Sequence, residues 1–309
     1  MMLLFLACVD PIHTPSPADS DVEDSTVLDD TSTVDSGSDT DDKDTDDEDT
    51  DDKDTGGDDT GGQDTDDDPP DYSQPGPVDF TTSTASMTTG TGCSLSYVHY
   101  SPEQPVGHVV LAHGFLRSSQ QMVGWAEHLA SWGLEVSVPD LCWSGFTPDP
   151  AKNALDIAEL ADGPVALVGH SAGGLAVTLA AADMSVTAVV GLDPVEQFGQ
   201  DNSSTAAAIN APALALFGAP GSCNSENSGE TFFGAVPGGR MMNLTGADHC
   251  DFENPTDMAC EAFCTANDAG FTDDQRRDAL AGVVTSFVMG QHVERHIDAA
   301  LDDGLLSDR

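Results

Sequence analysis

The pentapeptide G-H-S-A-G at 169–173 has the G-x-S-x-G pattern, in which a serine hydroxyl is presented for nucleophilic attack. An apolar segment at 164–170 precedes Ser171 and reads as a buried strand, and an alanine-rich segment at 171–184 reads as a helix. A serine between a strand and a helix sits on a tight turn that lifts its side chain above the strand ends. The pattern therefore predicts that Ser171 is the nucleophile of an acyl-transfer reaction.

Two backbone N–H groups are expected to bind the oxyanion of such a reaction. The turn places the N–H of Ala172 at a helix N-terminus, where the helix dipole favours negative charge. Gly169 and Gly173 leave room for the turn, because a β-carbon at either position would collide with neighbouring backbone. The segment LAHGFLRS at 111–118 ends an earlier strand, so the N–H of Phe115 is the second expected donor.

The general base is expected to be a histidine late in the chain, because the triad of proteins with this elbow runs in the order Ser, acid, His. His170 is the variable residue of the elbow, and its ring is expected to point away from the hydroxyl. His292 and His296 lie in a polar tail helix. His249 follows an apolar strand at the start of a loop, so it is the predicted base.

The acid could follow either of two strands. After the strand at 212–218, the usual place, no Asp stands near the strand end, and Glu226 and Glu230 lie further along a Gly/Ser-rich loop. Asp193 stands directly at the end of the preceding strand, where it could orient His249 and stabilise its imidazolium. Asp193 is the predicted acid and the two glutamates are the reserves, although an Asp-Pro pair can also simply form a turn.

Strands and helices alternate along the second part of the chain. Short apolar segments read as strands at 108–114, 134–140, 164–170, 185–194, 212–218 and 240–246. Amphipathic or alanine-rich segments read as helices at 120–131, 171–184, 254–267 and 272–290, and 94–102 reads as an antiparallel strand at the front. This alternation predicts an α/β domain over 78–309, with a mostly parallel sheet flanked by helices.

The elbow GHSAGG, the GLDPV after the next strand, and the spacings of 22 and 56 residues from Ser171 to Asp193 to His249 resemble one branch of the α/β-hydrolases. This branch contains chlorophyllases and platelet-activating-factor acetylhydrolases. The resemblance covers about residues 110–255, and it implies the α/β-hydrolase fold and ester hydrolysis through a Ser-His-Asp acyl-enzyme. Ala172 stands where plant chlorophyllases commonly have Arg, which disfavours a pigment substrate. Polyester hydrolases usually carry their acid later, so the chain fits them less well.

The segment between the Asp193 strand and the next strand is short, which predicts no large lid domain and an open site for small or medium esters. Phe115, Leu116, Trp143 and Phe146 could line the acyl or alcohol pocket, or belong to the core. No cofactor or metal is expected, and neither is an oligomer. Two alternatives stay open: a non-catalytic binding protein on a hydrolase scaffold, and a peptidase or thioesterase of the same fold.

Charge limits the possible partners. The 309 residues hold 55 acidic and 9 basic side chains, for a net charge of −46. Residues 1–72 carry −24 of this, and the remaining 237 residues carry −22. No positive footprint exists for nucleic acid or for anionic lipid head groups. The negative domain favours a neutral or apolar substrate over an anionic one.

The N-terminal part differs from the domain in composition. Residues 1–8 (MMLLFLAC) resemble the end of a bacterial lipoprotein signal peptide, which implies cleavage before Cys8, lipidation of its thiol and membrane attachment. Residues 9–77 are rich in Asp and Thr and poor in large apolar side chains, so they predict a disordered tether. They lack a full calcium-loop pattern, so diffuse cation binding is favoured over a specific calcium site. Export to the cell envelope, or secretion, is expected.

Six further cysteines fit export: Cys93, Cys142, Cys223, Cys250, Cys260 and Cys264. An even number in an exported chain predicts disulfides, with all fifteen pairings open. Four of the six lie between 223 and 264, so at least one bridge is expected in the C-terminal loops. The alternative is a zinc site formed by His249 with the last three cysteines, but these lack the tight C-x2-C spacing of such sites.

Overall fold

The computed structural model describes residues 68–161, 163–264 and 269–309. The predicted signal segment 1–8 with Cys8, and the predicted tether up to residue 67, lie outside the described residues. None of the helices in the described part of the chain combines the length and the apolar character that crossing a membrane requires.

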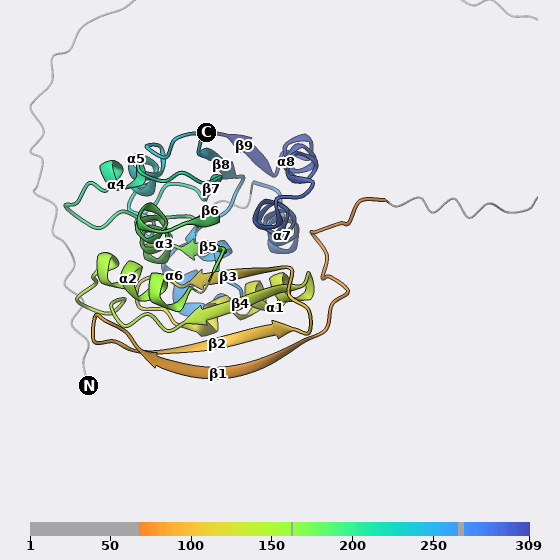
Figure 1. Ribbon diagram of the computed structural model, residues 1–309. Helices are drawn as coiled ribbons and strands as arrows, with labels where there is room; N and C mark the ends of the chain where they lie inside the picture. Colours follow the sequence, from red (N-terminus) through yellow and green to blue (C-terminus); the bar gives the residue numbers. More distant parts are fainter. Residues whose placement is uncertain (1–67, 162, 265–268) are drawn as a thin grey trace, which may run out of the picture. The chain divides into compact units, whose positions relative to one another are not determined.

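The described residues form one nine-stranded sheet in the order β1-β2-β4-β3-β5-β6-β7-β8-β9 (Figure 1). The six strands from β4 to β8 in this order are parallel, and β1, β2 and β9 add antiparallel pairings at the two edges. The strands are β1 (Phe80–Thr88), β2 (Ser94–Pro102), β3 (Gly107–Ala112), β4 (Leu134–Pro139), β5 (Val165–His170), β6 (Val186–Leu192), β7 (Ala213–Phe217), β8 (Arg240–Leu244) and β9 (Leu306–Asp308).

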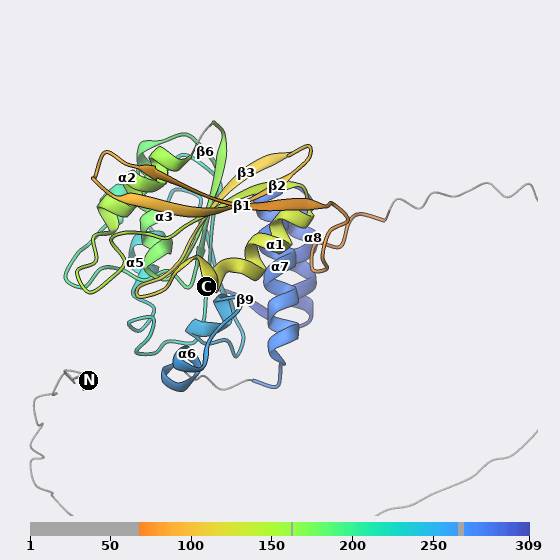
Figure 2. The ribbon, with the colours of Figure 1, turned by 90° about the horizontal axis from the view of Figure 1, so that it is seen from below.

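Helices cover both faces of this sheet, with α1, α7 and α8 on one side and α2, α3 and α5 on the other (Figures 1 and 2). Each face has its own apolar core, centred on residues such as Trp125 and Val283 on one side and Ile157 and Leu175 on the other. The helices are η1 (Ser119–Met122), α1 (Val123–Ser131), α2 (Pro150–Leu160), α3 (Ala172–Asp183), α4 (Ser203–Ala206), α5 (Gly229–Phe233), η2 (His249–Phe252), α6 (Met258–Phe263), α7 (Asp273–Met289) and α8 (Val293–Asp302).

The central strands are apolar along their whole length because helices cover both of their faces. Every residue of β5 is buried, and so is every residue of β7. The predicted parallel sheet with flanking helices is confirmed. The segment between β6 and β7, which the structure describes in full, contains only the four-residue helix α4, so no large lid domain lies in that segment.

The strand order reverses next to β3, because β4 lies on one side of β3 and β5 lies on the other. In open α/β sheets, ligands bind beyond the carboxyl ends of the strands at such a reversal. The loop after β3 and the turn after β5 begin at this point. The topology therefore brings together the two segments that are predicted to hold the oxyanion and the nucleophile.

Several elements of the described chain were not predicted, namely β1, α2, α4, α5, η2 and β9, and one predicted helix is shorter than expected. Strand β1 reads FTTSTASMT and is largely exposed, so it has no apolar alternation that would reveal it. Helix α2 starts with a clear sequence signature, an Asp149 cap followed by Pro150. Within the described residues, the helix predicted over 254–267 covers Met258–Phe263. It does not start at Asn254, because the Asn254 amide donates to the Gln121 carbonyl and the Asn254 carbonyl accepts from the Gly124 amide.

The folded domain begins before residue 78. Tyr72 is 1% exposed, its ring packs edge-on against Trp132 at 4.6 Å, and its hydroxyl donates to Gln291 at 3.2 Å. The Gly76 amide donates to the Ser131 hydroxyl at 2.8 Å. The predicted tether is therefore too long at its C-terminal end, because it includes an aromatic side chain that this domain buries.

We expect Tyr72→Ala to lower the free energy of unfolding by on the order of 3 kcal/mol, as for other buried aromatic side chains. Gln74→Ala, at an exposed position of the same segment, is the matched control and should change it by less than about 0.5 kcal/mol. Urea unfolding of both variants measures the difference. Equal stability of the two would mean that residues 68–77 add nothing to the domain.

Candidate active site

Ser171 occupies a strained turn between β5 and α3. Its backbone has φ 56° and ψ −125°, a conformation that residues with a β-carbon rarely adopt. Two bonds hold it there: the Ser171 amide donates to the Leu192 carbonyl at 3.0 Å, and its own carbonyl accepts from the Val195 amide at 3.1 Å. The end of strand β6 and the segment that follows it therefore stabilise the turn.

Steric contacts explain the glycines around the turn. A β-carbon at Gly169 would lie 2.4 Å from the Gly173 carbonyl oxygen, and one at Gly173 would lie 2.4 Å from the His113 carbonyl oxygen. A β-carbon at Gly114 would lie 2.9 Å from the β-carbon of Ser171. The elbow and the loop after β3 are thus in direct backbone contact, which only glycine permits at these positions.

The loop after β3 is oriented by His113. The His113 Nδ1–H donates to the Gly114 carbonyl at 2.8 Å, and its Nε2 accepts from the Leu141 amide at 2.9 Å. Burial lowers the pKa of His113, which favours this neutral tautomer. Because the peptide is planar and trans, fixing the Gly114 carbonyl turns the N–H of Phe115 the opposite way. The Ala172 N–H, at the start of α3, is the second predicted donor and has no intrahelical acceptor there.

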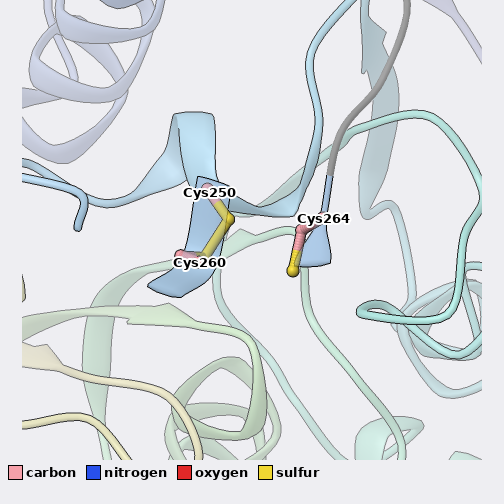
Figure 3. Close-up of side chains that lie close together, drawn as sticks. All are labelled: Cys250, Cys260 and Cys264. Carbon is pink, nitrogen blue, oxygen red and sulfur yellow. A yellow bond between two sulfur atoms is a disulfide. The ribbon is translucent and has the colours of Figure 1, made fainter. Parts of the chain in front are cut away.

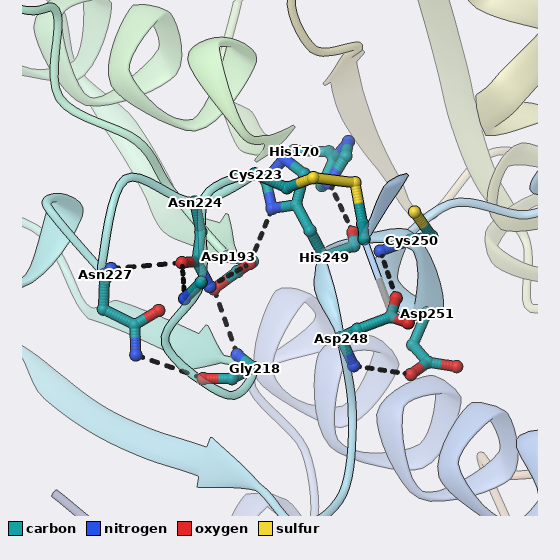
Figure 4. Close-up of polar contacts among 12 residues, drawn as sticks. His170, Asp193, Gly218, Cys223, Asn224, Asn227, Asp248, His249, Cys250 and Asp251 are labelled. Carbon is teal, nitrogen blue, oxygen red and sulfur yellow. Dashed lines mark hydrogen bonds and ion pairs between the residues drawn. A yellow bond between two sulfur atoms is a disulfide. The ribbon is translucent and has the colours of Figure 1, made fainter. Parts of the chain in front are cut away.

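Asp193 and His249 form a close pair (Figure 4). The His249 Nδ1 lies 2.6 Å from the Asp193 Oδ2. Asp193 directly follows β6, and its carboxylate also accepts from the Gly218 amide at 3.0 Å and from the Asn224 side-chain amide at 3.0 Å. The side chain has no exposed surface. Three donors therefore compensate a buried carboxylate and fix its orientation toward the histidine.

In the described part of the chain, the acid bonded to His249 is Asp193 and not one of the two reserve acids. Glu226 is exposed on the loop after β7, and Glu230 pairs with Arg309 at 2.9 Å. The loop instead supplies Asn224, which was not singled out in the sequence. Its amide also donates to the Ala219 carbonyl at 2.9 Å, and its Oδ1 accepts from the Gly221 amide at 2.9 Å. The sequence has no Asp near the end of β7, and this absence was the one signal that the loop could have a supporting function instead of supplying the acid.

The histidine segment is tied down by disulfides. Cys250, next to His249, is bonded to Cys260, and Cys223 is bonded to Cys264. The second bridge joins the Asn224 loop to the segment that follows His249. The third pair is Cys93–Cys142.

The predicted zinc alternative does not fit this arrangement. The sulfur atoms of Cys250, Cys260 and Cys264 lie within 4.8 Å of one another (Figure 3). All three are bonded in disulfides, so they offer no thiolate to a metal.

His170 was expected only as the variable residue of the elbow, but it contacts the predicted base. Its ring centroid lies 4.6 Å from that of His249, and its Nε2–H donates to the His249 carbonyl at 3.0 Å. Burial, followed by the charge of His249, holds the pKa of His170 well below its usual value. Because His170 adjoins Ser171 in sequence, this contact brings the histidine segment against the elbow.

Apolar side chains are exposed on loops at this edge of the sheet. Phe115 is 42% exposed, Leu116 is 51% exposed and Phe146 is 84% exposed, while Phe198 is fully exposed. The loops adjoin one another, since the Leu116 amide donates to the Ser144 carbonyl at 2.8 Å and the Gln197 side chain donates to the Pro148 carbonyl at 3.4 Å. Three of the four predicted pocket residues thus lie on solvent-facing loops beside the elbow.

Trp143, the fourth, is used in packing. Its indole N–H donates to Asp156 at 3.1 Å, and Lys152 lies 4.0 Å above its ring.

A small pocket of about 100 Å³ lies directly beside His249 and includes Phe263 and the loop at 219–224. A larger cavity of about 490 Å³ lies between α1, α7 and the segment before β1, and none of the predicted site residues lines it.

Comparison with known proteins adds one finding. Residues 109–285 match the family model described as "Alpha/beta hydrolase family". The match covers more than half of the chain, from β3 into α7, and it includes Ser171, Asp193 and His249. No curated protein matches the chain.

We expect Gly173→Ala to lower the free energy of unfolding by at least about 2 kcal/mol, because the added β-carbon overlaps the His113 carbonyl and backbone has to move. Gly145→Ala is the matched control, since a β-carbon there meets nothing within 4 Å, and its effect should stay within about 0.5 kcal/mol. Denaturant unfolding compares the two. If both variants are equally stable, the close approach at the elbow is not a constraint.

Proposed function

The chain belongs to the alpha/beta hydrolase family, and from that premise we propose that it is a serine hydrolase that cleaves carboxylic esters through an acyl-enzyme. The contact between His249 Nδ1 and Asp193 Oδ2 at 2.6 Å carries this proposal. A carboxylate that holds the Nδ1–H leaves Nε2 as the basic nitrogen of the ring. A base of this kind beside a G-x-S-x-G elbow suits proton transfer from Ser171.

In the proposed reaction, the Ser171 Oγ attacks the ester carbonyl carbon while His249 Nε2 takes the hydroxyl proton. The carbonyl oxygen becomes an oxyanion, which the N–H groups of Phe115 and Ala172 bind. The imidazolium then gives its proton to the departing alcohol. Water, activated by the same nitrogen, attacks the acyl-enzyme, and the carboxylic acid leaves as Ser171 regains its proton.

The substrate class follows from the surroundings of the site. Exposed Phe115, Leu116 and Phe146 favour an ester with an apolar acyl or alcohol part. A carboxylate-rich chain disfavours anionic substrates. With only the four-residue α4 between β6 and β7, no large element covers the elbow from that side, which suits small or medium esters.

We also propose that the enzyme acts outside the cytoplasm, held by a lipid on Cys8. Three disulfides support this setting, because such bonds persist in oxidising compartments. The support for lipidation is the sequence MMLLFLAC and the Asp/Thr-rich segment after it.

Replacing the nucleophile gives the most direct test. We expect Ser171→Ala to lower kcat for short p-nitrophenyl esters by at least about 10³-fold and to abolish labelling by a fluorophosphonate probe. Ser137→Ala is the matched control, because the Ser137 hydroxyl also lies near imidazoles, 3.2 Å from His99 and 3.1 Å from His108, but in the middle of a sheet. That variant should keep both activities. Labelling of the Ser171→Ala protein would place the nucleophile elsewhere, and no labelling of the wild type would favour a binding protein.

A second substitution tests the acid. We expect Asp193→Asn to lower kcat by about 10³–10⁴-fold, because an amide cannot hold His249 in the required tautomer or stabilise its imidazolium. Glu226→Gln removes an exposed carboxylate from the neighbouring loop and should leave kcat within about two-fold. Steady-state hydrolysis of the same ester measures both. A silent Asp193→Asn variant would contradict the assignment.

A further inference from the structure

A buried ionisable cluster lies against the predicted base and takes no part in the reaction described above. It consists of His170 from the elbow, Arg117 from the loop after β3, and Glu253, four residues after His249. The Glu253 side chain has no exposed surface, and its Oε1 lies 2.7 Å from the Arg117 Nε and 3.7 Å from the His170 Nδ1. Burying a carboxylate costs desolvation free energy. The position of Glu253 next to the proposed catalytic pair therefore indicates a functional role.

The hydrogen bonds of His170 leave one of its nitrogens unsatisfied. A carbonyl can only accept, so the bond of 3.0 Å to the His249 carbonyl requires the proton on Nε2. The Nδ1 of the neutral ring is then an acceptor. It is buried and has no hydrogen-bond partner in the described structure, since the Glu253 Oε1 at 3.7 Å lies beyond hydrogen-bond distance. A proton on Glu253 would supply the missing donor between these two groups.

Glu253 is poised between its two protonation states. Burial is the main cause that raises the pKa of Glu253 to about 7, while the charges of Arg117 and His249 act in the opposite direction. The charged and titratable groups that face it are Arg117 from the loop after β3, His170 from the elbow, and His249 and Asp257 from its own segment. Asp257 in turn pairs with Arg117 at 2.9 Å.

Three catalytic segments meet at this cluster. Arg117 lies two residues after the predicted oxyanion donor Phe115, His170 precedes Ser171, and Glu253 lies on the segment of His249. The ion pair of Arg117 and Glu253 therefore ties the oxyanion loop to the histidine segment. The ring contact of His170 ties both to the elbow.

We propose that Glu253 is a positioning residue for the base His249 and switches between two partners. As a carboxylate it pairs with Arg117 and stabilises the imidazolium that forms on His249 during the reaction. As a carboxylic acid, with a proton taken from solvent, it donates its O–H to His170 Nδ1, and the stabilising charge is lost. This inference rests on the proposed hydrolase function, because it acts through the base of that reaction.

The test is Glu253→Gln, which keeps the size of the side chain and removes its charge. At pH 8 we expect kcat for a p-nitrophenyl ester to fall about ten-fold, the size of effect expected when a nearby charge no longer stabilises the imidazolium. KM should change little, because Glu253 is not placed to touch the substrate. At pH 5.5 the variant and the wild type should agree within about two-fold, since Glu253 is then already protonated.

Stability separates this role from a merely structural one. A pKa raised to about 7 means that the folded state binds the Glu253 proton more tightly than the unfolded chain does. The stabilisation of the folded state by this proton is complete below pH 4.5 and is lost as the pH rises to about 7. The glutamine variant never ionises, so its stability relative to the wild type should increase over this range. A merely structural role predicts instead a loss of stability and of kcat that is the same at every pH.

Two controls complete the experiment. Glu230→Gln removes a carboxylate that is also paired with an arginine, but at Arg309, and should leave kcat unchanged at both pH values. Glu253→Asp retains the charge and should recover part of the loss at pH 8.

The outcomes distinguish the two proposals. If the wild type reacts with a fluorophosphonate probe and Glu253→Gln reacts equally fast at pH 8, the role of Glu253 is wrong and the hydrolase proposal stands. If the wild type is neither labelled nor active on esters, the hydrolase proposal is wrong, and the role of Glu253, which depends on it, is wrong as well.

Discussion

The close approach of three backbone segments at Ser171 is the constraint on which the rest of the site depends. Gly169, Gly173 and Gly114 have no space for a β-carbon, so β3, β5 and the start of α3 meet at van der Waals distance. That contact lets a residue with positive φ, Ser171, persist at the end of β5. The strand order allows it, since β3 and β5 are neighbours at the point where the order reverses.

The pair of Asp193 and His249 depends on loops that are joined covalently. Asp193 is buried and held by donors from two loops, and the disulfide Cys223–Cys264 links the loop of Asn224 to the histidine segment. A loop rich in Gly, Ser and Asn has little apolar surface of its own. A disulfide restricts the conformations of the unfolded loop, so less conformational entropy is lost on folding. The bridges thus compensate for the small apolar surface of these loops.

Elements with strong apolar periodicity are predictable from the sequence, and elements without it are not. The apolar strands β3 to β8 were predictable because helices cover both faces, which requires continuous apolar segments. Strand β1 was not, because its Ser/Thr-rich edge carries no such pattern. Tyr72 was assigned to the tether because its neighbours are polar; that it is buried depends on Trp132 and Gln291, which are distant in the chain.

The sequence alone determined the elbow, the Asp193 and His249 candidates and the α/β architecture, since each of these is encoded locally, in a short motif or a period. The tertiary structure alone decided which acid pairs with His249 and how the cysteines pair. It also decided that His170, Arg117 and Glu253 lie together next to His249. Those contacts join residues up to 136 positions apart, from Arg117 to Glu253, and they arise only when the sheet brings the ends of several strands to one edge. A short sequence pattern contains no information on which distant residues the fold brings into contact.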